Sequence, residues 1–342
     1  MSTDTGTQTD SGAGRQRSIL TPATNWIENL SESAYAYLLL TPAFALLTLV
    51  AFWPLVATFR LSLLADQTKG AAALGGFVGL ENYLNVLTGD IRLARQFFDM
   101  ELVGGFPFIQ LGTPFFQQAL FVTLAFALLN VLFTTLIGFG QALILDQDFR
   151  GRRWVRVAII IPWAVPIVIQ GMIFFLFFQP TVGFGSGVMQ SLGLFSANPL
   201  ASSQDSFFIV LIADIWKTSA FMALLILAGL QSVDRSLYDV ARVSGASPWQ
   251  RFKMITLPLV LPALLVAMLF RTMEAMRIYG LIESTAGCTT VPSMTCLVIE
   301  GLFGGTRIYG TAAAVAFITA AIIGLLISVY IVKFRDNEGG LY

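Results

Sequence analysis

The chain has 342 residues, of which 56% are hydrophobic and only 12% are charged. Soluble domains carry roughly twice that charged fraction, so the composition excludes an ordinary soluble globule and indicates a membrane protein. The formal net charge is zero, so no charge excess points to nucleic acid as a partner. Histidine is absent, which argues against histidine triads, HExxH zinc sites and an autonomous enzyme.

The chain begins with a polar stretch and continues with long apolar runs. Residues 1–34 are rich in Ser, Thr, Gly, Gln and Asp and lack the apolar core of a signal peptide, so we expect a disordered tail. A bilayer core about 30 Å thick needs roughly 20 apolar residues per helix. The sequence therefore predicts an all-α membrane protein of about six transmembrane helices, with a membrane domain at 35–335 and a short tail at 336–342. The expected spans are Ala36 to Phe59, Ala119 to Leu145, Val157 to Phe178, Phe207 to Leu230, Leu257 to Ile282 and Thr311 to Val332.

Basic residues between these spans predict the orientation, because Lys and Arg stay on the cytoplasmic side. With the N-terminus inside, twelve basic residues fall in inner segments and four in outer loops. We therefore expect a multi-pass protein of the cell membrane with both termini in the cytoplasm. The inner set is Arg15, Arg17, Arg150, Arg152, Arg153, Arg156, Arg235, Arg242, Arg251, Lys253, Lys333 and Arg335, and the outer set is Lys69, Arg92, Arg95 and Arg307.

Two features distinguish the outer side. The segment from Asp66 to Gln118 contains the run GGFVGLENYLNVL and is expected to pack as a small cap. Cys288 and Cys296 lie eight residues apart in the last outer loop, where oxidising conditions permit a disulfide. Their spacing fits a bonded pair and two free thiols equally well.

The connection between the fourth and fifth spans is too long for a simple bundle loop, and its composition is not typical of a loop. It reads QSVDRSLYDVARVSGASPWQRFKMIT and forms the main part of a candidate coupling loop at 232–258. Ser236, with Asp239 three residues later, predicts a capped helix start. Gly245 suits the left-handed residue that ends a helix. A first short helix is therefore expected between these positions.

A second helix start follows directly. Ser247 is expected as the N-cap, Pro248 as the first helical residue, and Gln250 as the partner that completes a capping box. The loop is therefore predicted to be two short helices joined by a tight Gly-Ala turn. The second helix should carry an apolar stripe of Trp249, Phe252 and Ile255.

The run YDVARVSGASPWQRFKMITLP resembles the signature loop of binding-protein-dependent ABC importer permeases, whose pattern is E-A-A, three residues, G, nine residues, I-x-L-P. The matching positions are Asp239, Val240 and Ala241 for E-A-A, Gly245 for G, and Ile255, Leu257 and Pro258 for I-x-L-P. Asp for Glu keeps the charge with a shorter reach, and Val for Ala widens the helix face. The likeness extends from about Tyr37 to Arg335 and is nearest to sugar permeases of the maltose and glycerol-phosphate type, which carry a run like FVGLENY. The Gly-Gly-Gly-Pro stretch usual after the fifth span is replaced by Thr285–Thr289, so the outer gate is expected to differ.

The resemblance implies partners. The loop would rest on an ATP-binding subunit. The alternative is that the loop is an amphipathic hairpin that only stabilises the bundle. A complete importer would contain two ATP-binding subunits that hold ATP and Mg, a second and different permease subunit, and an external solute-binding protein. No lysine of this chain follows a glycine, so it has no P-loop and no cofactor is expected on it. The residues assigned to coupling are Asp239, Ala241, Gly245, Ala246, Ser247, Leu257 and Pro258, the last two as a hinge to the fifth span.

Charged residues inside the predicted spans need a reason, since each costs at least about 2.5 kcal/mol in a bilayer. They fall in two groups with i, i+3 spacing, so each group can neutralise itself by ion pairing: Asp214 with Lys217 in the fourth span, and Arg271, Glu274 and Arg277 in the fifth. A hydroxylated substrate would form hydrogen bonds with the same charged groups and stack on aromatic side chains. The sequence therefore fits two interpretations of these charges, a structural network and a substrate path. The candidate substrate-path residues are Asp214, Trp216, Lys217, Arg271, Glu274, Arg277 and Tyr279.

The leading hypothesis is a permease subunit of an ATP-driven importer for a sugar. Glycerol phosphate, an amino acid or a polyamine are alternative solutes for the same class of importer. A six-helix secondary transporter or channel is the alternative from another class, but it has no use for the two-helix loop and no inverted repeat is evident. An intramembrane enzyme is the weakest hypothesis, because no Ser/His or metal set is assembled.

Overall fold

The computed structural model describes residues 31–67, 74–91, 93–102, 109–305 and 308–339. These residues fall into two units, divided between Thr58 and Phe59, and each unit is described by itself. Within the described ranges, five helices are long and apolar enough to cross a membrane, and a bent helix pair can count as a sixth. The prediction of an all-α membrane protein with about six spans is confirmed.

The first unit is helical from its first described residues. Ser31 caps the helix by accepting a hydrogen bond from the Ala34 N–H at 3.3 Å. The helix therefore starts inside the predicted tail, whose remaining residues, 1–30, lie outside the described ranges. Its elements are α2 (Glu32–Leu47), a π-helix (Thr48–Phe52) and α3 (Trp53–Ser62), the last of which enters the second unit.

Two π-turns allow spans to continue past prolines. In the first span the N–H of Trp53 donates to the carbonyl of Thr48, five residues back, and Pro54 follows. The π-helix Phe252–Thr256 precedes Pro258 in the same way. Proline has no N–H and its ring crowds the carbonyl four residues earlier, so a wider turn at that point relieves both problems. Both helices therefore run on where a break could be expected.

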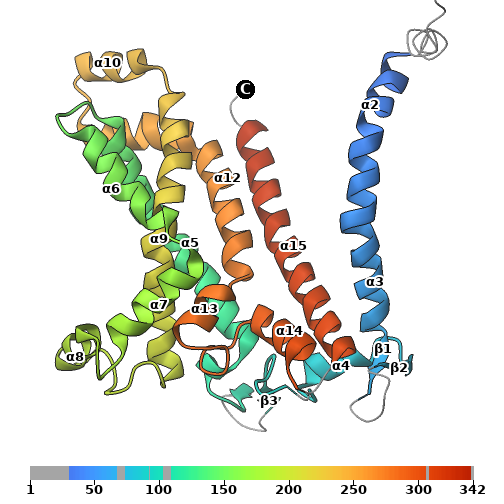
Figure 1. Cartoon of the computed structure of the whole chain (residues 1–342). Coiled ribbons are helices and arrows are strands. Elements are labelled where there is room, and N and C mark those ends of the chain that lie inside the picture. Colours follow the sequence, from blue (N-terminus) through green and yellow to red (C-terminus); the bar gives the residue numbers. More distant parts are fainter. Residues whose placement is uncertain (1–30, 68–73, 92, 103–108, 306–307, 340–342) are drawn as a thin grey trace, which may run out of the picture. The chain divides into compact units, whose positions relative to one another are not determined.

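Three long helices form the centre of the second unit (Figure 1). They are α5 (Ala119–Asp146), α9 (Ser203–Gln231) and α12 (Leu257–Met276). A Cβ added at Gly138 of α5 would lie 2.7 Å from the Met222 Cβ of α9, so the glycine permits their close approach. One apolar cluster includes Phe97, Phe126, Phe207, Met276, Leu281 and Leu297, and a second includes Ala142, Leu145, Met222, Ile226, Leu230 and Val260.

The third predicted span is not one helix. It consists of α6 (Arg152–Ala164) and α7 (Ile167–Phe178), whose axes differ by 93°. Val165 has extended dihedral angles (φ −71°, ψ 127°), as expected for a residue that precedes a proline, here Pro166. The span expected from Val157 to Phe178 is therefore two helices with a sharp bend between them and not one helix. After α7 the chain forms α8 (Phe184–Ser191) before it enters α9.

The fifth and sixth spans also differ from their predicted ends. Helix α12 stops at Met276, and a separate short helix, α13 (Gly280–Thr285), follows, so the expected span to Ile282 is wrong. Helix α14 (Met294–Phe303) leads to α15 (Tyr309–Gly339), which packs on α12 and α14. The expected tail at 336–342 is helical through Gly339.

The segment after α3 contains two antiparallel strand pairs and a helix. Strand β1 (Leu64–Asp66) pairs antiparallel with β2 (Leu74–Phe77), and β3 (Met100–Leu102) pairs antiparallel with β4 (Ile109–Leu111). Helix α4 (Glu81–Thr88) packs against α15, and a 3₁₀ turn (Phe115–Gln117) leads into α5. This end of the second unit lies opposite α10 (Arg235–Val243), as Figure 1 shows.

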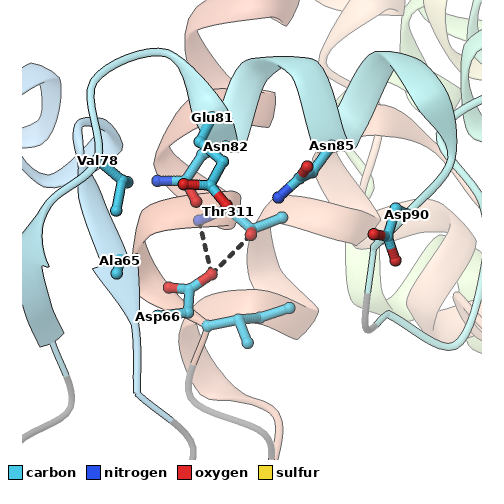
Figure 2. A pocket seen from close by; sticks show the side chains of 9 residues that line it. Ala65, Asp66, Val78, Glu81, Asn82, Asn85, Asp90 and Thr311 are labelled. Carbon is cyan, nitrogen blue, oxygen red and sulfur yellow. Dashed lines mark hydrogen bonds between the residues drawn. The ribbon is translucent and has the colours of Figure 1, made fainter.

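The FVGLENY run has a structural role at this end. Asn82 donates to the carbonyls of Ser62 and Leu64, both at 2.8 Å, and the hydroxyl of Tyr83 lies 2.7 Å from that of Ser62. Beside them, Asp66 accepts hydrogen bonds from the N–H and hydroxyl of Thr311 at 3.0 and 2.6 Å (Figure 2). This carboxylate caps the N-terminus of α15, where unpaired N–H groups favour a negative charge. The run thus fastens α4 to the end of α3.

Candidate functional site

The predicted two-helix loop is present, and its first helix is α10. Its N-cap is Asp234, which accepts a hydrogen bond from the Ser236 N–H at 2.9 Å. The expected capping box of Ser236 and Asp239 is therefore wrong, because the aspartate two residues earlier takes the cap position. The backbone N–H of Ser236 holds the pKa of Asp234 below its ordinary value of 3.8.

The base of α10 is tied to α5. Arg235 forms two hydrogen bonds with Asp146, the last residue of α5, at 2.8 and 2.6 Å. This bidentate contact raises the pKa of Arg235. Across the loop, the Tyr238 hydroxyl lies 3.0 Å from the Thr256 hydroxyl. The two-helix loop, which we call the hairpin from here on (residues 232–258), is therefore anchored at its base on both sides.

Gly245 ends α10 as expected. Its φ is +81°, its N–H donates to the carbonyl of Arg242 at 3.1 Å, and the N–H of Ala246 donates to the carbonyl of Ala241 at 2.9 Å. This pair of bonds is the Schellman motif, which satisfies the last carbonyls of a helix and requires a left-handed residue. No atom lies within 4 Å of a Cβ built at Gly245, so the requirement there is conformational.

The second helix starts at α11 (Pro248–Arg251) with the predicted capping box. The Gln250 N–H donates to the Ser247 hydroxyl at 3.3 Å, and the Ser247 N–H donates to the Gln250 side chain at 2.7 Å. This helix is not a separate short element. It continues through the π-turn into α12, so Pro248–Met276 is one helix of 29 residues. Leu257 and Pro258 lie within this continuous helix, directly after the π-turn, and their role as a hinge stays a prediction.

The tip of the hairpin exposes apolar side chains. The exposed fractions are 66% for Val240, 90% for Val243, 69% for Trp249 and 74% for Met254. Trp249 stacks on Phe252 but leaves most of its ring outside, so the predicted apolar stripe faces the bundle only in part. Large apolar side chains exposed in this way are typical of a contact surface.

The other predicted coupling residues surround this patch. Asp239 and Arg242 are exposed and lie 3.7 Å apart, too far for a strong ion pair. Gly245 and Ser247 are exposed, whereas Ala241 and Ala246 are half-buried against the turn. The structure thus brings the predicted residues of α10 and the turn together at one tip. It places Leu257 and Pro258 further along the second helix, away from the turn.

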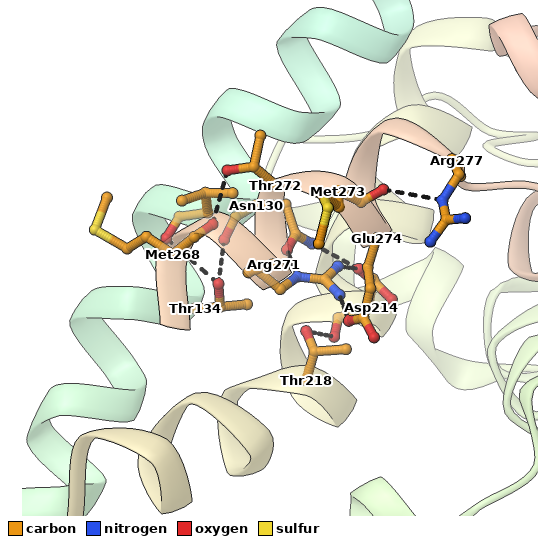
Figure 3. Close-up of polar contacts among 11 residues, drawn as sticks. Asn130, Thr134, Asp214, Thr218, Met268, Arg271, Thr272, Met273, Glu274 and Arg277 are labelled. Carbon is orange, nitrogen blue, oxygen red and sulfur yellow. Dashed lines mark hydrogen bonds and ion pairs between the residues drawn. The ribbon is translucent and has the colours of Figure 1, made fainter. Parts of the chain in front are cut away.

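A buried polar network lies inside the bundle (Figure 3). Arg271 of α12 donates to Asn130 of α5 at 2.7 Å, to Glu274 at 3.0 Å, and to Asp214 of α9. Asn130 also donates to Asp214, at 2.8 Å. The Arg271 side chain is only 3% exposed, so this network joins three central helices by charge-assisted hydrogen bonds.

Lys217 has a different partner from the one expected. Its ammonium donates a hydrogen bond at 2.8 Å to the carbonyl of Val165, which is the residue at the break between α6 and α7. Gln170 of α7 donates to the carbonyl of Ala213 at 2.5 Å. The expected pairing of Asp214 with Lys217 is therefore wrong, because the broken helix supplies an acceptor for the lysine. Lys217 thus satisfies a backbone carbonyl that the break leaves open inside the bundle.

The network opens on a pocket of about 270 Å³, called the polar pocket from here on. Six of the seven candidate substrate-path residues line it: Asp214, Lys217, Arg271, Glu274, Arg277 and Tyr279. Trp216 does not line it, because its ring packs toward Phe174, with centroids 5.9 Å apart. The walls also include Trp163, Ile167, Thr218, Ile278 and Gly280.

Sequence reasoning missed Asn130, which holds the centre of the network. Its signal was present, since Asn130 is an amide in the middle of the apolar run from Ala119 to Leu145. Its exposed fraction is 0%, and a buried amide in a membrane helix requires partners. The two cysteines also acquire a definite state, because Cys288 and Cys296 form a disulfide with Cα atoms 5.6 Å apart.

The fold and these sites define a multi-pass membrane protein with a rigid hairpin at one end and a polar pocket within the bundle. A family model described as "Binding-protein-dependent transport system inner membrane component" matches residues 134–335. The chain is 33% identical over 305 residues to the trehalose/maltose transport system permease protein MalF of Thermococcus litoralis, covering 88% of this chain and 93% of that protein. It is 32% identical over 320 residues to the sulfoquinovosyl glycerol transport system permease protein SmoG of Agrobacterium fabrum, covering 92% and 94%. The chain therefore belongs to this family of inner membrane transport components.

Solved structures share the fold. The chain matches a chain of a bacterial ABC transporter involved in the import of the acidic polysaccharide alginate, with a TM-score of 0.67 and 19% sequence identity. The match covers 92% of this chain and 97% of that one. The long helices and their order are thus common to both proteins.

Proposed function

We propose that this chain is a permease subunit of an ATP-binding-cassette importer that carries a sugar across the cell membrane. The observation that carries this proposal is the hairpin, whose Gly245 turn, capped second helix and exposed apolar tip coincide with the signature-loop spacing. Relatives named as trehalose or maltose permeases support a sugar as the solute. The polar pocket offers carboxylates, two arginines and a tyrosine, the groups that bind hydroxylated ligands.

The hairpin would dock on an ATP-binding subunit. Its anchored base and exposed tip suit a rigid contact, because little conformational entropy is lost when a preorganised surface binds. The partners in this proposal are two ATP-binding subunits that hold ATP and Mg, a second permease subunit that differs from this one, and an external binding protein. Both termini lie in the cytoplasm in this arrangement, on the same side as the hairpin.

An anionic solute is the second candidate. The polar pocket is lined by three basic side chains, Lys217, Arg271 and Arg277, against two carboxylates, Asp214 and Glu274. Arg277 is exposed, and its Nε donates to the backbone carbonyl of Met273 at 3.3 Å. A relative of 27% identity is named as an sn-glycerol-3-phosphate permease. The excess of basic groups would favour a phosphate or sulfonate on the ligand.

The test uses the tagged chain purified with its natural partners. We expect mass spectrometry of the co-purified proteins to identify an ATPase and a second permease. In vesicles loaded with ATP, labelled trehalose or maltose should accumulate only when the external binding protein is added. Labelled glycerol 3-phosphate tests the second candidate in the same vesicles. Accumulation driven by an ion gradient without ATP would overturn the importer assignment.

A further inference from the structure

A second pocket of about 350 Å³ adjoins the polar pocket, and Tyr279 forms part of the wall of both. We call it the disulfide pocket, because Cys288 and Cys296 both line it. Its other walls include Glu283 of α13 and Glu300 of α14, with Ile299 and Phe303 as apolar surface. Its volume falls in the range of about 300–1,000 Å³ that is typical of small-molecule sites.

Both carboxylates of the disulfide pocket are held in place by backbone groups. The Cys288 N–H donates to Glu283 Oε2 at 3.1 Å, and the Ala94 N–H donates to Glu300 Oε1 at 2.8 Å. A carboxylate accepts about four hydrogen bonds, so each retains acceptor capacity toward the pocket. Fixed acceptors of this kind suit the hydroxyl groups of a ligand.

The loop that carries these groups is itself braced. The disulfide closes it between α13 and α14, and Arg95 donates to the carbonyl of Thr289 at 2.9 Å. Ser293, at the start of α14, donates to the carbonyl of Ile278 at 2.8 Å. The wall is therefore fixed before a ligand arrives, which lowers the entropic cost of binding.

We propose that the disulfide pocket is a second carbohydrate subsite, which holds a neutral sugar unit before it passes Tyr279 into the polar pocket. This inference rests on the proposed sugar transport. The aromatic faces of Phe303 and Tyr279 provide apolar surface for the sugar ring, while Glu283 and Glu300 accept its hydroxyl protons. Phe303 is 80% exposed, so its ring is available to a ligand.

Charge sets the specificity of the disulfide pocket. Its two carboxylates repel an anion, whereas the polar pocket has an excess of basic groups. A phosphorylated or sulfonated sugar would therefore meet an unfavourable field at the disulfide pocket. The pair of pockets selects neutral saccharides over glycerol phosphate and similar solutes.

The first arm of the test removes the aromatic surface. Equilibrium binding of labelled maltose and trehalose is measured on the purified complex without the external binding protein, so that only the membrane sites contribute. Phe303→Ala should weaken the binding of the preferred sugar about three- to tenfold, as expected for loss of one aromatic contact. Phe77→Ala is the matched control, because Phe77 is 75% exposed on β2 and touches neither pocket. Equal amounts of assembled complex exclude a folding defect.

The second arm changes the charge. The double variant Glu283→Gln, Glu300→Gln should bind the neutral sugar several-fold more weakly and should allow glycerol 3-phosphate to compete. Unchanged sugar binding in both arms, with sugar uptake intact in the unmodified complex, would overturn the subsite and leave the proposed function standing. Calcium binding that is lost in the double variant, without any effect on sugar, would also overturn it. An unmodified complex that neither binds nor transports any sugar refutes the proposed function, and the subsite falls with it.

Discussion

Replacement of Gly245 tests the link between the hairpin and transport. The residue has φ +81°, and a Cβ there meets no atom within 4 Å, so a side chain adds backbone strain without a clash. The left-handed conformation costs an ordinary L-residue about 1–2 kcal/mol, and a β-branched residue more. A cost of about 1.4 kcal/mol lowers the equilibrium constant that favours the native turn over its alternatives roughly tenfold. Gly245→Val should therefore abolish uptake while the subunit stays in the membrane.

A graded series separates strain from other effects. Asn tolerates the left-handed conformation best after Gly, so uptake should fall in the order Gly, Asn, Ala, Val at position 245. Gly151→Val is the matched control, because Gly151 has φ +92° and equally open space but lies in the connection between α5 and α6. We expect the control to keep most of its uptake in ATP-loaded vesicles at equal membrane abundance, measured by immunoblot. Normal transport by Gly245→Val would refute the placement of the coupling turn.

Three further predictions address the network, the topology and the cap. Arg271→Met leaves the Asp214 carboxylate buried without its cation and should cost about 3–5 kcal/mol, seen as loss of assembled complex, whereas adding Asp214→Asn should restore assembly. If the double variant also transports normally, these groups are only scaffold. Cysteines introduced at Ser203 and Ser232 should react with impermeant reagents from opposite sides, Ser203 from outside, and labelling from one side would remove a span. Because the pKa of Asp234 is lowered, its carboxylate caps α10 fully above pH 3.8, and the cap is lost only at pH values below this. Hydrogen-exchange protection of the Ser236 amide should therefore fall at more acidic pH. The Asp234→Asn variant should remove that pH dependence.

Local signals predicted the hairpin well. Gly245 and the Ser247 cap act within a few residues of themselves, and both behave as their sequence context indicates. The shift of the first cap from Ser236 to Asp234 is also local, since both residues can accept from a nearby N–H. Short-range hydrogen bonding thus fixed this element almost completely.

Pairing within the membrane could not be predicted in the same way. Spacing at i, i+3 suggested Asp214 with Lys217, but Lys217 reaches a carbonyl 52 residues earlier in the chain, freed by the break at Pro166. Such a partner exists only after α6, α7 and α9 have packed. Asn130 was overlooked for the same reason, because its importance comes from Arg271 on another helix, 141 residues later.

The positions of the hairpin and the polar network on shared helices connect them mechanically. The second helix of the hairpin is continuous with α12, which carries Arg271, and Arg235 of the first helix binds Asp146 at the end of α5, which carries Asn130. Under the proposed function, a partner that displaces the hairpin is expected to act on both α12 and α5. The Arg271 to Asn130 hydrogen bond joins these two helices, so a change in their separation breaks or restores it. In the proposed importer, we expect a hydroxylated or anionic solute in the polar pocket to replace the partner that the buried arginine loses.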